Sequence, residues 1–353
     1  MTGCQVDSSD LTTAYQHIPV LLAEVTQQLN PSRCSVVVDC TFGYGGHASA
    51  LLSHIAPRAT FIGIDRDEGA HITQHTAPPH VARLGQQETL AQLAQSREIE
   101  FILVRDNFAN LDRILRDIGV GYVDAFLFDI GVSSPQIDDP ARGFSYHQDG
   151  PLDMRMDRSL KRTAADLANE EDEAELTRIL RTYGEERWAS RIAHFIVARR
   201  KAAPIETTGQ LVDLVREAIP AAARREGGHP AKRTFQALRI ALNGELDALE
   251  RGLESAIRWL RPEGRVAVLT FHSLEDRLVK RMFRDHALRC SCPPDMPICQ
   301  CGCTPALEII TRKAIVPSAA EIEANPRARS TKLRVAQKLE YAPLRNPVAD
   351  ADR

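Results

Sequence analysis

The sequence predicts an α/β fold, in which an open and mostly parallel sheet carries an inserted all-helical domain. Three observations predict it. First, Val36 to His47 reads as a short β-branched strand, a glycine-rich turn and a helix that starts at about Gly46. Second, successive apolar runs end in an acidic residue. Third, about 120 residues separate the fourth strand from the fifth, where a helical crossover needs far fewer.

The elements of the sheet domain follow from hydrophobic periodicity. A first helix starts near His17 with Pro19 in its first turn, and further helices cover 48–55 and 88–96. The expected strands are 36–38, 60–65, 100–104, 123–129 and 264–271, with two C-terminal strands at 306–311 and 331–335. Because ligands of an open parallel sheet lie beyond the carboxyl ends of its strands, we expect the acids there to converge on one crevice, namely Asp39, Asp65, Asp106 and Asp129.

The inserted domain is predicted from apolar spacings within 175–183, 188–196 and 211–215. A leucine-rich stripe over 234–260 predicts one long helix that leads into the fifth strand. The domain prediction is therefore 17–140 with 236–340 for the sheet domain and 141–235 for the insert. Residues 1–16 are expected to be disordered and 341–353 to be flexible.

Bulk composition places the chain among ordinary soluble proteins. It has 353 residues, enough for about two domains, with 43% hydrophobic and 26% charged residues. No apolar run approaches the roughly 20 residues of a membrane span, and the N-terminus does not read as a signal peptide, so we expect no membrane partner and a cytoplasmic location. The net charge of −3 means that nucleic-acid binding must depend on local basic patches.

The glycine turn predicts a nucleotide-like cofactor without choosing it. Gly43, Gly45 and Ala48 satisfy the dinucleotide pattern G-x-G-x-x-A, and Asp65 stands where a ribose-binding acid is expected. Asp39, however, would repel a pyrophosphate, whereas S-adenosylmethionine has no phosphate and carries cationic groups. The alternatives are a turn that binds nothing and, at 65–67, a solvated turn.

Several long motifs along the chain resemble those of a known protein family. The chain is similar to the bacterial 16S ribosomal RNA cytosine-N4 methyltransferase family from about His17 to Leu339. The motifs that carry the resemblance are HxPVLL from His17, DCTFGYGGH from Asp39, DIGVSSPQ from Asp129, RGFSY from Arg142, GPLDMRMD from Gly150, YGEER from Tyr183, FQALRI from Phe235, FHSLEDR from Phe271 and NPRxRS from Asn325.

The resemblance implies a class I, Rossmann-like methyltransferase fold, S-adenosylmethionine as donor and a cytosine in the decoding (P-site) region of the small ribosomal subunit as acceptor. Carried over by position, the cofactor contacts are Gly45, Gly46, His47, Asp65, Phe108, Asp129 and Gln136, to which the strand-end argument adds Asp39. Phe108 would lie against adenine, with a core position as the alternative. Tyr44 and Thr331 depart from the family's usual residues.

Methylation of an exocyclic amine needs acceptors for the N–H bonds. We expect them in the loop 129–136, with Asp129 and Ser134 as candidates, and His272 as a residue that orients the base or relays a proton. A structural hydrogen bond is the alternative role of His272. The loop lacks an aromatic to stack on the base, which Phe144 or Tyr146 would supply.

Basic residues are the candidates for holding an RNA strand whose target base is splayed out. They are Arg142, Arg155, Arg233, Arg239, Arg327, Arg329 and Lys332. Asp153 and Arg155 are assigned to substrate contacts, with an internal ion pair as the alternative.

Five cysteines crowd between Cys290 and Cys303. A zinc site through Cys290, Cys292, Cys299 and Cys301 is one reading, and reduced thiols in a surface loop are the other. Methylation of DNA or protein, or RNA binding without turnover, remain rival functions, and a homodimer is one oligomeric state to test.

Overall fold

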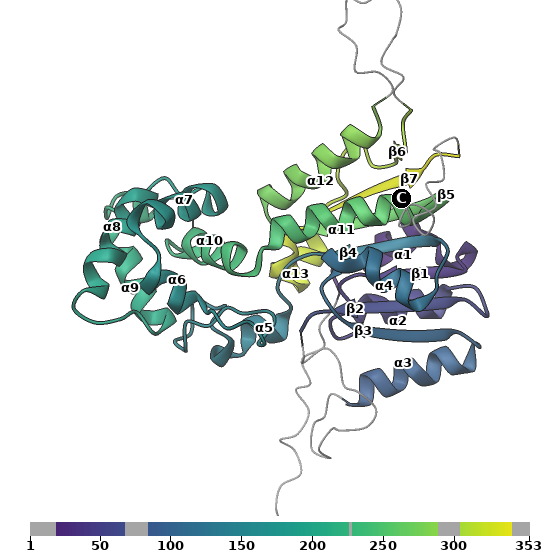
Figure 1. Ribbon diagram of the computed structural model, residues 1–353, viewed down its shortest axis with the longest axis horizontal. Coiled ribbons are helices and arrows are strands. Elements are labelled where there is room, and N and C mark those ends of the chain that lie inside the picture. Colours follow the sequence, from purple (N-terminus) through teal and green to yellow (C-terminus); the bar gives the residue numbers. More distant parts are fainter. Residues whose placement is uncertain (1–18, 68–83, 226–227, 289–303, 341–353) are drawn as a thin grey trace, which may run out of the picture.

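The computed structural model describes residues 19–67, 84–225, 228–288 and 304–340 (Figure 1). The predicted disordered N-terminus, the flexible C-terminus and the cysteine cluster of 290–303 lie outside these residues. No helix in the described ranges is long and apolar enough to cross a membrane.

The described residues form a seven-stranded sheet in the order β3-β2-β1-β4-β5-β7-β6. Strand β7 is antiparallel to both β5 and β6, and the other pairs are parallel, which confirms the mostly parallel sheet. The strands are β1 Val36–Asp39, β2 Thr60–Asp65, β3 Glu100–Arg105, β4 Val123–Asp129, β5 Leu260–Thr270, β6 Leu307–Ile309 and β7 Lys332–Lys338.

Helices cover both faces of this sheet, so its central strands are apolar throughout. Neighbouring residues of one strand enter opposite cores: Val37 packs with α1 and α2, and Val38 packs with α4 and α11. The helices of the sheet domain are α1 Leu22–Leu29, α2 Gly46–His54, α3 Leu84–Ser96, α4 Leu111–Ile118, α11 Glu245–Trp259, α12 Ser273–His286 and α13 Ala319–Ala324, with short 3₁₀ turns at Pro31–Arg33, Phe108–Asn110 and Pro326–Ser330.

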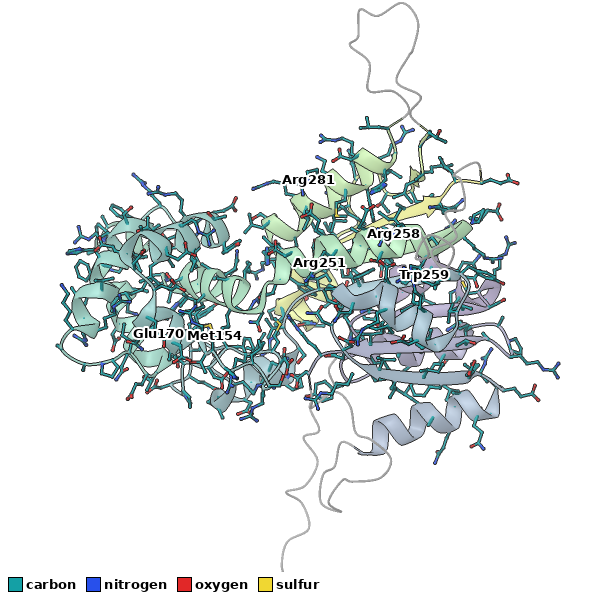
Figure 2. The ribbon with its side chains drawn as sticks, viewed as in Figure 1. Met154, Glu170, Arg251, Arg258, Trp259 and Arg281 are labelled. Atoms are coloured by element: carbon teal, nitrogen blue, oxygen red, sulfur yellow. The ribbon has the colours of Figure 1, made fainter. Side chains whose placement is uncertain are left out.

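The excess residues between β4 and β5 build a second, helical core from Phe144 to Leu238. Figure 1 shows these helices as a separate group beside the sheet, and Figure 2 labels Met154 and Glu170 within it and Trp259 over the sheet. Its elements are α5 Ser134–Asp138, α6 Ala164–Glu170, α7 Glu173–Gly184, α8 Ala189–Arg200, α9 Thr208–Ala218 and α10 Lys232–Asn243, with 3₁₀ turns at Pro140–Arg142 and Ala223–Arg225.

The expectation of one helix over 234–260 was wrong. The chain forms two helices, α10 and α11, which break at Gly244 in the left-handed conformation with φ of +57°. The leucine spacing continues through the break, but its two halves serve different cores: Leu238 packs in the insert and Leu249 on the sheet. The first helix also starts later than expected, at Leu22, so Pro19 precedes it.

Candidate active site

Three acidic residues end three neighbouring strands. Asp39, Asp65 and Asp129 are the last residues of β1, β2 and β4, and β1 lies between the other two strands. Asp106 follows β3 directly. The strand order therefore puts Asp39, Asp65 and Asp129 at the same end of the sheet, whereas the Asp106 side chain bonds to Asn110 and Arg113 in the segment that follows β3.

The turn after β1 requires glycine at two positions, one because of its backbone conformation and the other because of a close neighbour. Gly45 has φ of +79° and caps helix α2, a conformation that favours glycine. A Cβ at Gly46 would lie 2.7 Å from Cγ of Pro19. Substitution at either position therefore displaces the turn that starts α2.

Asp65 joins this turn to the end of β2. Its Oδ2 accepts a hydrogen bond from the backbone N–H of Gly43 at 2.7 Å, and its Oδ1 accepts one from Asp67 N–H at 2.8 Å. These bonds fix the Asp65 carboxylate at the end of β2, where the sequence predicts a ribose-binding acid.

Asp39 and Asp129 are joined through Thr41. The Thr41 hydroxyl accepts from the Asp129 backbone N–H at 2.6 Å and donates to Asp39 Oδ1 at 3.4 Å, and Thr41 N–H donates to the same oxygen at 3.0 Å. Burial is the main reason that the pKa of Asp39 rises from 3.8 to about 7. The Thr41 hydrogen bond and His47 lower this pKa, and Asp129 and Asp65 raise it. A cationic ligand beside Asp39 would favour its ionised form.

His47 is buried between these two carboxyl groups. Its side chain is 5% exposed, and Nε2 lies 3.5 Å from Asp129 Oδ2. Burial lowers the pKa of His47, but the nearby Asp129 carboxylate and the charge of Asp39 raise it above 6.5 overall. Neither ring nitrogen has a hydrogen-bond partner within the described residues, and nor has Asp129 Oδ1. Unpaired buried polar atoms are costly, so this corner fits a polar ligand.

A charged network that the sequence did not predict lies beside the crevice. Gln136 donates from Nε2 to Asp67 Oδ2 at 2.5 Å, and Arg142 donates to the same oxygen at 3.0 Å. Gln136 Oε1 also accepts from Ser133 N–H at 3.0 Å, which starts helix α5. The network thus joins the loop after β2 to the loop after β4.

Arg66 connects the same loop to the helical insert. Its guanidinium donates to the Asn243 carbonyl at 3.1 Å and contacts the Met156 sulfur. Asn243 in turn accepts from Met156 N–H and donates to the Met154 carbonyl, both at 2.9 Å. Arg66 therefore connects the end of β2 to the residue that precedes the helix break at Gly244.

Phe108 and His272 contact neighbouring protein groups. The Phe108 ring meets Phe128 edge-on with centroids 5.6 Å apart, so part of it belongs to the core. His272 caps helix α12: Nδ1 accepts from Glu275 N–H at 3.4 Å, and Nε2 lies 3.0 Å from Glu275 Oε1. This is the structural role that was the alternative for His272. Ser134, the first residue of α5, is half-buried.

Arg142 and Arg155, two of the predicted substrate contacts, face inward. Besides Asp67, Arg142 donates to the carbonyls of Arg155 and Met156 at 3.0 and 3.3 Å. Arg155 makes a two-pronged ion pair with Asp153, with both bonds at 2.8 Å. The internal ion pair, which was the alternative, is the arrangement present.

The other substrate candidates differ in accessibility. Phe144 is 8% exposed and belongs to the insert's core, whereas Tyr146 stacks on His229 with centroids 4.7 Å apart. Arg327 pairs with Asp138 at 2.5 Å, and Arg329 is exposed.

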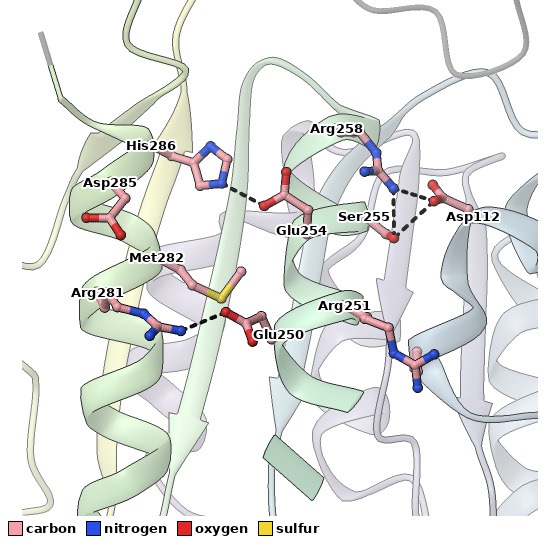
Figure 3. Close-up of a pocket in the computed structure, with 11 residues that line it drawn as sticks. Asp112, Glu250, Arg251, Glu254, Ser255, Arg258, Arg281, Met282, Asp285 and His286 are labelled. Atoms are coloured by element: carbon pink, nitrogen blue, oxygen red, sulfur yellow. Dashed lines mark hydrogen bonds and ion pairs between the residues drawn. The ribbon is translucent and has the colours of Figure 1, made fainter. Parts of the chain in front are cut away.

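A cavity of about 600 Å³ between α11, α12 and the start of α4 contains none of these residues (Figure 3). Ion pairs cross it: Arg281 reaches Glu250 at 2.6 Å, and His286 reaches Glu254 at 2.8 Å. Arg251 points away from these pairs. These ion pairs neutralise most of the charges that line the cavity. We therefore interpret it as a gap between packed helices and not as a binding site.

Comparisons with known proteins cover nearly all of the described residues. The model of the MraW methylase family matches residues 14–339. "Ribosomal RNA small subunit methyltransferase H" of Symbiobacterium thermophilum is 53% identical over 93% of this chain and 98% of that protein. The proteins of the same name from Heliobacterium modesticaldum and Geobacter sulfurreducens are each 51% identical over 92% of this chain and 99% of their own.

Among solved structures, an rRNA methylase from Streptococcus thermophilus aligns over 90% of this chain and 92% of that one. The TM-score is 0.36 and the identity is 12%.

Proposed function

We propose, from the premise that this chain belongs to the MraW methylase family, that it transfers the methyl group of S-adenosylmethionine to N4 of a cytidine in the decoding region of 16S ribosomal RNA. The observation that carries the proposal is the cluster formed by Asp39 and Asp129, at the ends of the adjacent strands β1 and β4, with the buried His47 in the first turn of α2. The relatives' shared name, at about half identity over nearly their full lengths, supports ribosomal RNA of the small subunit as the acceptor.

The residues present fit the donor. The Asp65 carboxylate would accept the ribose hydroxyls, and the exposed part of Phe108 would face the adenine. Asp39 and Asp129 supply the negative charge that a cationic amino acid moiety needs, next to the unpaired nitrogens of His47. When bound, S-adenosylmethionine supplies an electrophilic methyl group on its sulfonium.

The chain must make a poor nucleophile react. The lone pair of cytosine N4 is delocalised into the ring, so hydrogen-bond acceptors at the two N–H bonds return electron density to nitrogen. Asp129 Oδ1, which lacks a partner among the described residues, is the acceptor that we assign, and it takes the proton that N4 loses when the methyl group leaves the sulfonium. Ser134 and the backbone carbonyls of 129–136 lie beside it. Holding N4 in line with the methyl group contributes up to ~7 to 11 kcal/mol.

In this proposal His272 positions other groups and does not contact the substrate. Its cap on α12 fixes the end of β5, because Glu275 Oε2 also accepts from the backbone N–H groups of Phe271 and His272, at 2.8 and 3.2 Å. We assign His272 to positioning and the RNA contacts to the insert of 141–235 and the basic C-terminal segment. The enzyme would act in the cytoplasm on the small subunit.

The decisive experiment is transfer of labelled methyl from S-adenosylmethionine to small ribosomal subunits that lack this modification, followed by nucleoside analysis. We expect the label on N4-methylcytidine. Label on cytosine C5 or on a ribose would refute the assigned chemistry. Asp129→Asn should abolish transfer while Asp213→Asn, at an exposed position on α9, should leave it unchanged.

A further inference from the structure

A second cavity lies where the insert meets the end of β5, and none of the cofactor residues line it. Its volume is about 710 Å³, within the roughly 300 to 1,000 Å³ range of ligand sites. We call it the basic cleft. The residues that matter here are Arg187, Trp188, Arg224, Lys232, Arg233 and Lys332.

The basic cleft carries a positive charge that the protein neutralises only in part, since within the described residues Lys332 alone of its cations forms an ion pair, with Asp276 at 2.9 Å. Five of its lining residues are arginine or lysine, against two carboxylates, Glu185 and Glu186. Glu185 is already paired with Arg277 at 2.8 Å and accepts from Ser273 Oγ at 2.7 Å. Glu186 is 6% exposed and accepts from the Trp188 backbone N–H at 2.9 Å. A polyanion therefore fits the cleft.

An aromatic surface accompanies this charge. Trp188 is half-buried at the start of α8, and the Arg187 guanidinium lies 5.5 Å from its ring centroid. Cations along a groove with an aromatic platform are the pattern of proteins that bind single-stranded nucleic acid, because every base can stack. A site for inorganic anions would need only the cations, so the indole of Trp188 favours a ligand that carries bases.

The cleft adjoins the loop proposed to act on cytosine N4. Phe271 lines the cleft, and its ring would lie 3.2 Å from a Cβ built on Gly131. Gly131 is two residues beyond Asp129, whose strand pairs with β5 through Leu269. A strand lying in the cleft would therefore pass beside the methyl-transfer loop.

We infer that the basic cleft binds single-stranded RNA next to the target cytidine, with one flanking base stacked on Trp188 and phosphates held by Lys232 and Arg233. Both cations are exposed at the start of α10. The inference rests on the proposed function, since it assigns the flanking-strand contacts of the same acceptor.

The junction between α7 and α8 holds the cleft open at a fixed width. Glu185 adopts the left-handed conformation with φ of +48°, and its carbonyl accepts from Arg233 at 3.0 Å while its carboxylate is held by α12. The two walls of the cleft, from the insert and from the sheet domain, are thus joined at one residue.

The first test separates stacking from packing at Trp188. We expect Trp188→Ala to raise the KM for small subunits roughly tenfold, Trp188→Phe to stay near wild type, and the Kd for S-adenosylmethionine to stay unchanged in both. Melting temperatures check that both variants fold. Equal losses in both variants, or no loss in Trp188→Ala, would overturn the stacking role.

The second test concerns charge. The double variant Lys232→Ala with Arg233→Ala should weaken subunit binding and reduce the slope of log affinity against log salt by about 1.4, since each single-strand phosphate contact contributes about 0.7. Lys201→Ala is the matched control, because Lys201 is exposed at the far end of α8, about 20 Å along the helix from Trp188. A salt slope that is the same in both variants would overturn the phosphate contacts.

A direct readout uses the two tryptophans of the chain. Trp259 is 1% exposed and donates to Asp112 at 2.7 Å, so short single-stranded RNA should quench the fluorescence of Trp188 alone. A quench that persists in Trp188→Phe would contradict the inference. Quenching by RNA-free ribosomal proteins and not by RNA would instead assign the cleft to a protein and overturn it.

The two proposals fail in different ways. If the wild-type chain transfers no methyl group to subunits, the proposed function fails. If it transfers methyl normally and the cleft variants keep the wild-type KM, only the inference about the cleft fails.

Discussion

The amide of Gln136 donates to the carboxylate of Asp67 at 2.5 Å, across 69 residues of sequence. Asp67 thereby fixes two predicted cofactor contacts at once, because its own backbone N–H donates to Asp65. This relation connects the ends of β2 and β4 on either side of β1.

We expect Asp67→Asn to raise the Kd for S-adenosylmethionine about tenfold. The substitution keeps the shape of the side chain but removes the charge that Gln136 and Arg142 contact, and hydrogen bonds to charged groups contribute about 1.5 to 3 kcal/mol. Calorimetric titration measures the effect. Asp213→Asn, at an exposed residue, is the control, and an unchanged Kd in Asp67→Asn would show that the network does not support the cofactor site.

The stability of the ligand-free protein should fall as the pH rises from 5 to 7. The folded pKa of Asp39, about 7, lies above its ordinary 3.8, so this group stabilises the fold below 3.8 and loses that contribution as pH rises through 7. His47, whose pKa is also raised, acts in the same direction above 6.5. Urea unfolding across this range should show a slope of up to about 1.4 kcal/mol per pH unit from Asp39, which Asp39→Asn removes.

Binding of S-adenosylmethionine should release a proton near neutral pH. A cation beside Asp39 lowers the pKa of this carboxyl from about 7, so affinity should rise between pH 6 and 8. Titrations in buffers of different ionisation enthalpy measure the released proton. Proton uptake, or a pH dependence that is unchanged in Asp39→Asn, would contradict a cation at this carboxylate.

The break between α10 and α11 should depend on glycine. We expect Gly244→Ala to destabilise the fold by roughly 1 kcal/mol, because alanine disfavours the left-handed conformation while no atom lies within 4 Å of the added methyl group. Gly121 has equally open space and no left-handed φ, so Gly121→Ala should cost nothing. Equal unfolding midpoints in urea for the two variants would argue against this explanation.

The sequence predicted the features that depend on residues close together in the chain, and it missed features that depend on distant contacts. Strands β2 and β4 were predicted residue for residue, because a buried parallel strand is a continuous apolar run that here ends in an acid. The meeting of Asp39, Asp65 and Asp129 followed from a rule about parallel sheets. The break at Gly244 was missed because apolar spacing does not reveal which core each half contacts.

The network around Asp67 could not be predicted in the same way. Its partners are 69 and 75 residues away, and Arg66 reaches Asn243 across 177 residues. In the sequence these residues form only a charged turn. Arg142 was predicted to face outward for the same reason, because its acceptors are Asp67 and backbone carbonyls that only the fold brings together. Arg155 pairs with Asp153, two residues away, which is the alternative that the sequence already offered.

A substitution at Arg142 can test whether this residue contacts RNA, as the sequence predicts, or holds the fold together, as its hydrogen bonds indicate. Its side chain is 12% exposed and pairs with Asp67, which is 9% exposed, so Arg142→Ala removes the cation paired with a buried carboxylate and should destabilise the fold by about 3 kcal/mol. Because the guanidinium faces inward, the salt dependence of subunit binding should not change. Arg233→Ala should instead reduce the salt dependence of subunit binding and change the free energy of unfolding by less than about 0.5 kcal/mol. Adding Asp67→Asn to Arg142→Ala should recover part of the lost stability, as a double-mutant cycle measures; if it recovers none, the two side chains do not act as a pair.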